Sequence, residues 1–190
     1  MRIIAGKAKG KKLLVPSPEI TRPTADRAKE ALFGILESRF IAEGRSFAEI
    51  NFLDAFAGSG AIGLEALSRG AKYVVFAEKN PEAEACIRKN LTAINGQEKA
   101  DIYGDVLKLP KAKSAFSVVF LDAPYGKGLI VPALSYLRRA GWIGADTICI
   151  AENEAKENFT GAEGFIITDV RKYGRASFIF LKIADDEDKK

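Results

Sequence analysis

The feature that most constrains the fold is an alternation of strand, glycine turn and helix that begins near residue 50. The run INFLDAF (50–56) is typical of a buried strand, and the helical pattern AIGLEALSRG (61–70) follows it. The strand-like runs YVVFAE, ADIYGD, FSVVFLD and TICIAE come next, with helical stretches at 80–95 and 129–140. Apolar strands that alternate with helices predict a mostly parallel sheet covered on both faces.

Both ends of the chain depart from this alternation. GFIITDVRKYGRASFIFLKI (164–183) predicts two strands around a Tyr-Gly turn, so an antiparallel hairpin should close the sheet. At the other end, RIIAG and KKLLV joined by KAKG predict a basic hairpin, and Thr24 can cap a helix over 25–38. We therefore expect a hairpin and helix extension (1–45), a main α/β domain (46–185) and a charged tail (186–190).

Composition excludes several kinds of chemistry. The chain has 190 residues and no histidine, and its two cysteines, Cys86 and Cys149, lie far apart, so a zinc or iron site has almost no ligands. We expect no metal and two free thiols. An apolar run of membrane-spanning length and a signal-peptide pattern are both absent from the sequence, which predicts a cytoplasmic protein without membrane contact. Any reaction should use carboxylates, backbone groups, Lys or Arg, hydroxyls or an organic cofactor.

The positive charge is concentrated at the start of the chain. Residues 1–29 contain eight Lys and Arg against one Glu and one Asp, a net +6, whereas the whole chain carries +4. This segment is either a solvated basic leader or an arm that binds the phosphates of a nucleic acid. The interleaved β-like runs favour the second interpretation, with Arg2, Lys7, Lys9, Lys11 and Lys12 as the candidate contacts.

A glycine loop joins the first strand of the alternation to its helix. Gly58, Gly60 and Gly63 form G-x-G-x-x-G, which brings backbone N–H groups and a helix N-terminus against a ligand. Glu78 lies twenty residues after Gly58 and ends the next strand, where an acid can bind ribose hydroxyls. The pattern fits a nicotinamide or flavin dinucleotide, and a tight turn without any ligand is the alternative.

Acids at the ends of four successive strands favour a different cofactor. These are Asp54, Glu78, Asp105 and Asp122, and all four should meet at the carboxyl edge, where open α/β sheets bind ligands. Together they would repel an anionic dinucleotide and suit a sulfonium cation. The negative charge of Asp54 suits the ammonium group of a methionine, and Asp105 can accept a hydrogen bond from an adenine. S-adenosylmethionine is therefore the favoured cofactor.

The tetrapeptide DAPY (122–125) follows the fourth of these strands. Asp122 and the carbonyl of Ala123 can both accept hydrogen bonds from one amino group, and Pro124 restricts Ala123 to extended geometry. Tyr125 can stack on the ring that carries the amine. A planar exocyclic amine is a poor nucleophile, so two fixed acceptors would provide positioning and electrostatic stabilisation without a histidine. An ordinary strand-to-loop turn is the alternative.

At these residues the chain resembles a known family. DAFAGSGAIGLEALSRGA resembles motif I of S-adenosylmethionine-dependent methyltransferases, and DAPY resembles the D/N-P-P-Y/F tetrapeptide of those that methylate exocyclic amino groups. With RIIAGKAKGKKLLVP, TRPTADRAKEALF and KYGRASFIFL, the chain resembles the bacterial family that methylates N2 of a guanine in 16S ribosomal RNA. This implies a Rossmann-like class I methyltransferase fold, with a seven-stranded sheet whose last strand is antiparallel.

The resemblance also implies roles for individual residues. The segment Arg22-Pro23-Thr24 would lie over the cofactor, and the basic hairpin would contact RNA. The expected cofactor contacts are Asp54, Phe56, Gly58, Gly60, Glu78, Lys79, Asp105, Val106, Arg22 and Thr24. The expected partner is ribosomal RNA or a small ribosomal subunit particle, bound by a monomer.

One position departs from the family pattern, which usually has proline where this chain has Ala123. The carbonyl acceptor survives, so we expect only a modest loss of rate or stability. The alternatives to guanine-N2 methylation are an NAD(P)-dependent oxidoreductase, an adenine-N6 nucleic-acid methyltransferase and an RNA-binding protein without activity.

Overall fold

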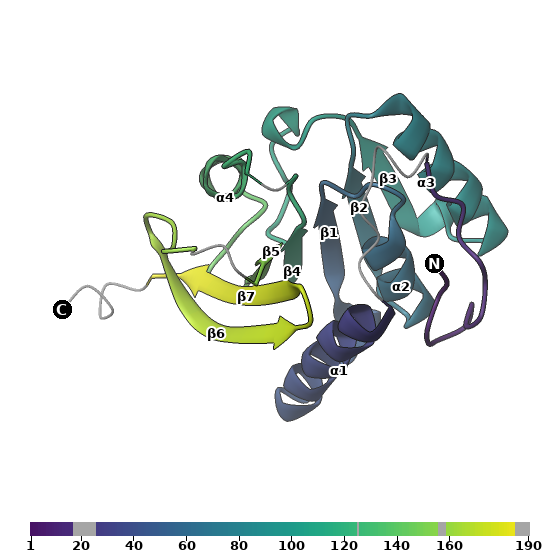
Figure 1. Cartoon of the computed structure of the whole chain (residues 1–190), viewed down its shortest axis with the longest axis horizontal. Helices are drawn as coiled ribbons and strands as arrows, with labels where there is room; N and C mark the ends of the chain where they lie inside the picture. Colours follow the sequence, from purple (N-terminus) through teal and green to yellow (C-terminus); the bar gives the residue numbers. More distant parts are fainter. Residues whose placement is uncertain (17–25, 125, 156–158, 185–190) are drawn as a thin grey trace.

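A seven-stranded sheet forms the centre of the computed structural model, which describes residues 1–16, 26–124, 126–155 and 159–184 (Figure 1). The strand order is β3-β2-β1-β4-β5-β7-β6, and β7 alone runs in the direction opposite to the other strands. The predicted fold class and the closing hairpin are therefore confirmed. The strands are β1 Asn51–Ala55, β2 Tyr73–Ala77, β3 Ala100–Tyr103, β4 Val118–Leu121, β5 Ile148–Glu154, β6 Phe165–Tyr173 and β7 Ala176–Ile183.

The helices start and end where local signals predict, with one exception. Asn80 caps α3, because its Oδ1 accepts hydrogen bonds from the N–H groups of Glu82 at 2.9 Å and Ala83 at 3.1 Å. The exception is α1, which continues past residue 38 because Phe40 is buried and Arg39 lies 4.2 Å from the ring centroid of Phe180. The helices are α1 Asp26–Ala42, α2 Ala61–Ser68, α3 Pro81–Ala93 and α4 Ile130–Arg139, with short 3₁₀ turns η1 Phe47–Glu49, η2 Gln97–Lys99 and η3 Val106–Lys108.

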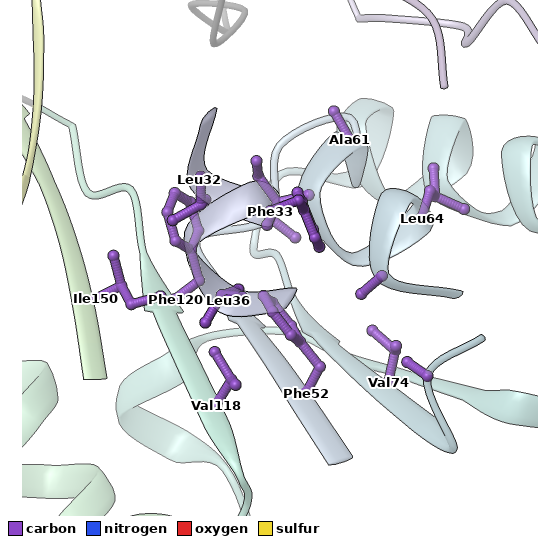
Figure 2. Close-up of a cluster of buried hydrophobic side chains, with 14 of the residues drawn as sticks. Leu32, Phe33, Leu36, Phe52, Ala61, Leu64, Val74, Val118, Phe120 and Ile150 are labelled. Atoms are coloured by element: carbon purple, nitrogen blue, oxygen red, sulfur yellow. The ribbon is translucent and has the colours of Figure 1, made fainter. Parts of the chain in front are cut away.

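Helices cover both faces of the sheet. On one face Leu32, Phe33 and Leu36 of α1 pack against the sheet, over Phe52 of β1 and Phe120 of β4 (Figure 2). On the other face α4 packs over the alternate residues of the same strands. Since α1 shares this core, the extension at 1–45 is packed against the main domain, and the exact domain division stays a prediction.

The two basic runs at the N-terminus do pair, although over one bridge only. Arg2 and Lys12 form an isolated antiparallel bridge, and the N–H of Ile3 donates to the carbonyl of Lys11 at 2.9 Å. The resulting N-terminal segment (1–14) lies beside α2 and α3 (Figure 1). Of the predicted hairpin, the structure thus retains one isolated antiparallel bridge and no regular strands.

A buried ion pair fixes this N-terminal segment to α2. The carboxylate of Glu65 accepts hydrogen bonds from the N–H groups of Ile4 at 2.8 Å and Ala5 at 3.0 Å. The Nζ of Lys29 lies 3.4 Å from Glu65 and donates to the carbonyl of Arg2 at 2.6 Å. Burial lowers the pKa of Lys29, while the charge of Glu65 partly offsets that shift. The sequence analysis includes Lys29 among the cations of residues 1–29. In the structure Lys29 is buried, so it fixes the N-terminal segment and is not a surface charge.

Candidate active site

The glycine loop between β1 and α2 has a conformation that few residues other than glycine adopt. Gly58 and Gly60 have φ of +55° and +77°, and Phe56 reaches +71° without being glycine. The N–H groups of Phe56 and Ala57 donate to the carbonyl of Ala77 on β2, at 3.1 and 3.0 Å. These bonds fix a left-handed backbone at Phe56, which is the kind of local strain that occurs at ligand sites.

Close packing explains the third glycine of the motif. A Cβ atom at Gly63 would lie 2.3 Å from the ring of Phe76, so only glycine lets α2 approach β2 this closely. The N-terminus of α2 is therefore held directly over the carboxyl ends of β1 and β2, where its positive dipole faces the edge of the sheet.

Glu78 connects the glycine loop to the next helix. One carboxylate oxygen accepts a hydrogen bond from the N–H of Gly58 at 2.7 Å, and the other accepts from the N–H of Asn80 at 2.7 Å. Each carboxylate oxygen can accept more than one hydrogen bond, so both remain able to bind ligand hydroxyls. The structure therefore holds Glu78 at the mouth of the loop with a fixed orientation.

Asp54 lies beneath the glycine loop on β1. Its side chain is 1% exposed, and its Oδ2 accepts a hydrogen bond from the N–H of Gly63 at 2.8 Å. Burial raises the pKa of Asp54 to about 7; the bond from Gly63 opposes this rise, and the charge of Glu78 adds to it. Whether Asp54 contacts the cofactor stays a prediction.

The residues that follow β3 lie at the same edge of the sheet. Asp105 caps η3 by accepting a hydrogen bond from the N–H of Leu107 at 3.0 Å, and it is half-buried. Val106 is buried, whereas Lys79, which follows β2, is exposed. The structure thus brings Glu78 and Asp105 to adjacent strand ends, as the strand pattern predicts.

Asp122 follows β4 at the same edge of the sheet. It is half-buried, Ala123 is buried and Pro124 is exposed, while Tyr125, Arg22 and Thr24 lie outside the described residues. Burial raises the pKa of Asp122 well above its usual range, and the negative charges of Glu152 and Asp54 raise it further. A carboxyl group in this state binds a proton more readily than an ordinary aspartate does.

Comparisons with known proteins show the family of the chain. The family model described as "Conserved hypothetical protein 95" matches residues 1–182. The chain belongs to this family. Its relatives include "Ribosomal RNA small subunit methyltransferase D" of Haemophilus influenzae, 36% identical over 94% of this chain and 91% of the relative. "Putative rRNA methyltransferase YlbH" of Bacillus subtilis is 29% identical over 96% and 98% of the two chains.

Solved structures similar to this member of the Conserved hypothetical protein 95 family are also described as methyltransferases or methylases. "Putative methyltransferase yhhF" from Escherichia coli superposes with a TM-score of 0.81 at 28% identity, covering 96% of this chain and 97% of the other. The putative methylase HI0767 from Haemophilus influenzae has a TM-score of 0.76 at 30% identity, over 97% and 99%. The expected family resemblance and the class I methyltransferase fold are confirmed, and methyltransferase activity follows from them.

The predicted RNA contacts all lie on the N-terminal segment of this family member. Arg2, Lys7, Lys9, Lys11 and Lys12 are exposed there. Among residues 1–16, 26–124, 126–155 and 159–184, no three His, Cys, Asp or Glu side chains gather closely enough to hold a metal ion. Nor does any helix in the described part of the chain have the length and apolar character needed to span a membrane.

Two site residues are not found by the sequence reasoning. Asn90 of α3 donates to the carbonyls of Leu14 at 2.9 Å and Ser59 at 3.2 Å, so it ties the N-terminal segment to the glycine loop. A polar residue in the middle of a helix gives no signal of such contacts. Glu152 on β5 is buried beside Asp122. A signal for Glu152 exists, because it closes the run TICIAE just as the other acids close theirs.

The raised pKa of Asp54 predicts a pH dependence of stability. A carboxyl group with a raised pKa in the folded state binds its proton more tightly there, so stability falls as pH rises from about 4 to about 7. A shift of this size corresponds to about 4 kcal/mol at most. Asp54→Asn keeps an acceptor oxygen for Gly63 and cannot ionise. As pH rises from about 4 to about 7, the unfolding free energy of Asp54→Asn should therefore increase relative to that of the wild type.

Urea unfolding at pH 5 and pH 8 measures this difference. Asp146→Asn, at an exposed position, serves as the matched control and should follow the wild type at both values. Equal changes of the unfolding free energy with pH in the wild type and in Asp54→Asn would contradict this prediction. They would show that Asp54 has the same pKa in the folded and unfolded states.

Proposed function

We propose that this protein transfers a methyl group from S-adenosylmethionine to the exocyclic N2 amino group of a guanine in 16S ribosomal RNA. The observation that carries the proposal is the placement of the glycine loop, Glu78 and the Asp122-Ala123-Pro124 turn at one edge of the sheet. The relatives named ribosomal RNA small subunit methyltransferase D support the class of substrate.

The residues at this edge fit S-adenosylmethionine. Glu78 has acceptor oxygens held at the mouth of the loop, and Asp105 and Asp54 add acidic groups that suit a cationic ligand better than an anionic dinucleotide. The N-terminus of α2 and the loop residues Phe56, Gly58 and Gly60 would line the binding site, with Lys79, Val106, Arg22 and Thr24 as further contacts. When bound, the cofactor supplies an activated methyl group.

The turn after β4 would orient the amine. Asp122 and the carbonyl of Ala123 would each accept one hydrogen from the guanine N2, which fixes its lone pair toward the transferred carbon. The side chain of Ala123 is buried, and this burial limits the conformational freedom of its backbone even though the family's usual proline is absent. The amine gives up one proton as the new N–C bond forms, and the raised pKa of Asp122 suits it to receive that proton. Tyr125 would stack on the base.

The N-terminal segment would bind the RNA. Its exposed cations can neutralise RNA phosphates, and such contacts do not depend on the base sequence of the RNA. These cations are Arg2, Lys7, Lys9, Lys11 and Lys12. Asn90 holds the end of this segment against the glycine loop, so the bound RNA would lie close to the cofactor. We propose that the protein acts in the cytoplasm as a monomer, on ribosomal RNA or on the small ribosomal subunit particle, without a metal.

Transfer of radiolabel from S-adenosylmethionine tests this proposal. The acceptors are small ribosomal particles and naked 16S RNA from cells that lack the endogenous enzyme, followed by nucleoside mass spectrometry and mapping of the modified nucleotide. We expect labelled N2-methylguanosine. Labelled N6-methyladenosine would assign the protein to the adenine methyltransferases, and tighter binding of NAD(P) than of S-adenosylmethionine would favour the oxidoreductase. Cofactor binding without transfer to either acceptor would contradict the proposed reaction.

A further inference from the structure

The hairpin of β6 and β7 carries a second group of cations, separate from those of the N-terminal segment. The sequence around its turn is RKYGRA (171–176), with three cations and no acid. Nε of Arg171 lies 3.0 Å from Oδ2 of Asp169, so this cation forms an ion pair within β6. Lys172 and Arg175 are exposed on the two sides of the turn. We call these two residues the basic turn, and the proposed function does not use them.

The strand register places the basic turn at the edge of the sheet that carries Asp122. β5 runs parallel to β4, and Asp122 follows the β4 residue that pairs with Ala151. β7 runs antiparallel to β5, and its first residue, Ala176, pairs with Glu154, the last residue of β5. The turn therefore lies about 10 Å to the side of Asp122, which is two strand spacings, and about 7 Å further along the strand direction.

Backbone and ring contacts hold the turn in this position. The N–H of Ala155, the residue after β5, donates to the carbonyl of Arg175 at 2.9 Å. The ring centroid of Tyr173 lies 5.9 Å from that of Phe178, which in turn lies 6.3 Å from that of Phe120 on β4. A turn that is already fixed to β4 and β5 loses less entropy when its side chains bind a ligand.

The charges around the site indicate which ligand the basic turn would bind. Glu78 and Asp105 lie at the same edge of the sheet, and carboxylates repel the phosphates of an RNA strand. The N-terminal segment lies beside α2 and α3, whereas β6 and β7 form the opposite end of the sheet (Figure 1). Asp122 follows the central strand β4 and therefore lies between these two basic regions. An RNA strand that presents a base to Asp122 would meet cations on both sides of that base.

We propose that Lys172 and Arg175 bind phosphates of the RNA strand on the side of the target guanine that faces away from the N-terminal segment. This inference rests on the proposed function and deepens it. The N-terminal segment and the basic turn hold the strand at two places, with the target nucleotide between them. Such phosphate contacts fix the position of the strand and carry no base specificity. They lower KM, and the methyl-transfer step itself depends on Asp122 and Ala123.

The salt dependence of RNA binding tests this inference. Filter binding of the full chain to naked 16S RNA and to small ribosomal particles is measured over a range of KCl concentrations. Each phosphate contact on a single strand contributes roughly 0.7 to the slope of log K against log salt. The double variant Lys172→Gln, Arg175→Gln should therefore lower the slope by about 1.4 and weaken binding on the order of 10-fold at about 0.1 M salt. KM should rise in the same variant while kcat changes little.

Two further variants serve as controls. Lys72→Gln combined with Lys99→Gln removes the same charge from exposed positions just before β2 and β3, at the opposite edge of the sheet, and should keep the wild-type slope. Lys172→Arg combined with Arg175→Lys keeps both charges and should bind RNA as the wild type does. Calorimetric titration with S-adenosylmethionine should give the same affinity for all of these proteins.

The binding measurement needs no turnover, so it is separate from the test of the proposed function. Methyl transfer by the wild type decides the proposed function, and the slope decides the role of the basic turn. A slope of Lys172→Gln, Arg175→Gln equal to that of the Lys72→Gln, Lys99→Gln control would overturn the inference. Weaker binding with an unchanged slope would also overturn it, because the lost contacts would then not be contacts with phosphates.

Discussion

Replacing Glu65 with alanine should lower the unfolding free energy by about 3–5 kcal/mol, as expected when one partner of a buried ion pair is removed. The Glu65 carboxylate is fully buried and accepts hydrogen bonds from the N–H groups of Ile4 and Ala5. It also binds Nε of Arg69 at 3.0 Å and lies 3.4 Å from Nζ of Lys29. Without it, the charge of Lys29 and two N–H groups lose their acceptor.

Urea unfolding at neutral pH measures this loss. Glu84→Ala is the matched control, because it removes the exposed ion pair between Glu84 and Arg88 of 2.6 Å and should cost less than about 1 kcal/mol. Glu65→Ala combined with Lys29→Met removes both charges and should recover part of the loss. A cost no larger than that of Glu84→Ala would show that the pair does not anchor the N-terminal segment.

The variant should also affect the binding of RNA. Glu65 and Lys29 hold the backbone of the N-terminal segment, and its five candidate RNA contacts are exposed on that backbone. Loosening the segment adds an entropic cost when those cations must be ordered on the RNA. We therefore expect weaker binding together with the lower stability, since both depend on the same contacts.

The strands and the glycine loop could be predicted from sequence because their signals are local. Each apolar run ends in a turn residue, and Asn80 followed by Pro81 marks the start of α3 without knowledge of any distant contact. The expected spacing also brought Glu78 and Asp122 to one edge, because the carboxyl ends of parallel strands meet there. The same rule, applied to the run that ends in Glu152, would have added the fifth acid.

The polar contacts in the interior could not be predicted in this way. Glu65 and Lys29 lie on different helices, and their sequence patterns are compatible with surface positions. Only the packing of α1 and α2 on the same face of the sheet brings them together and buries both. The burial of Asp54 likewise depends on the approach of Gly63 over β1, a contact that the motif does not specify.

Replacing Asp122 with alanine should reduce methyl transfer on the order of 100- to 1000-fold, the size of effect seen when one group that stabilises a transition state is removed. Asp122 is assigned as an acceptor for the reacting amine, so its loss leaves the amine free to rotate. Glu78 and the glycine loop remain, and binding of S-adenosylmethionine, measured by calorimetry, should change little. Normal turnover by this variant would remove Asp122 from the mechanism.

The pH profile distinguishes the carboxylate from a neutral acceptor at the same position. Burial and the charges of Glu152 and Asp54 raise the pKa of Asp122, so the wild type should lose kcat/KM as pH falls through a value above the usual range of an aspartate. A protonated Asp122 has lost the charge that orients the amine and takes up its proton. Asp122→Asn keeps one acceptor oxygen and cannot titrate, so it should retain part of the activity of the wild type and lose this acidic limb. A limb that persists in Asp122→Asn belongs to another group, and Asp54, with its pKa raised to about 7, is then the group to replace next.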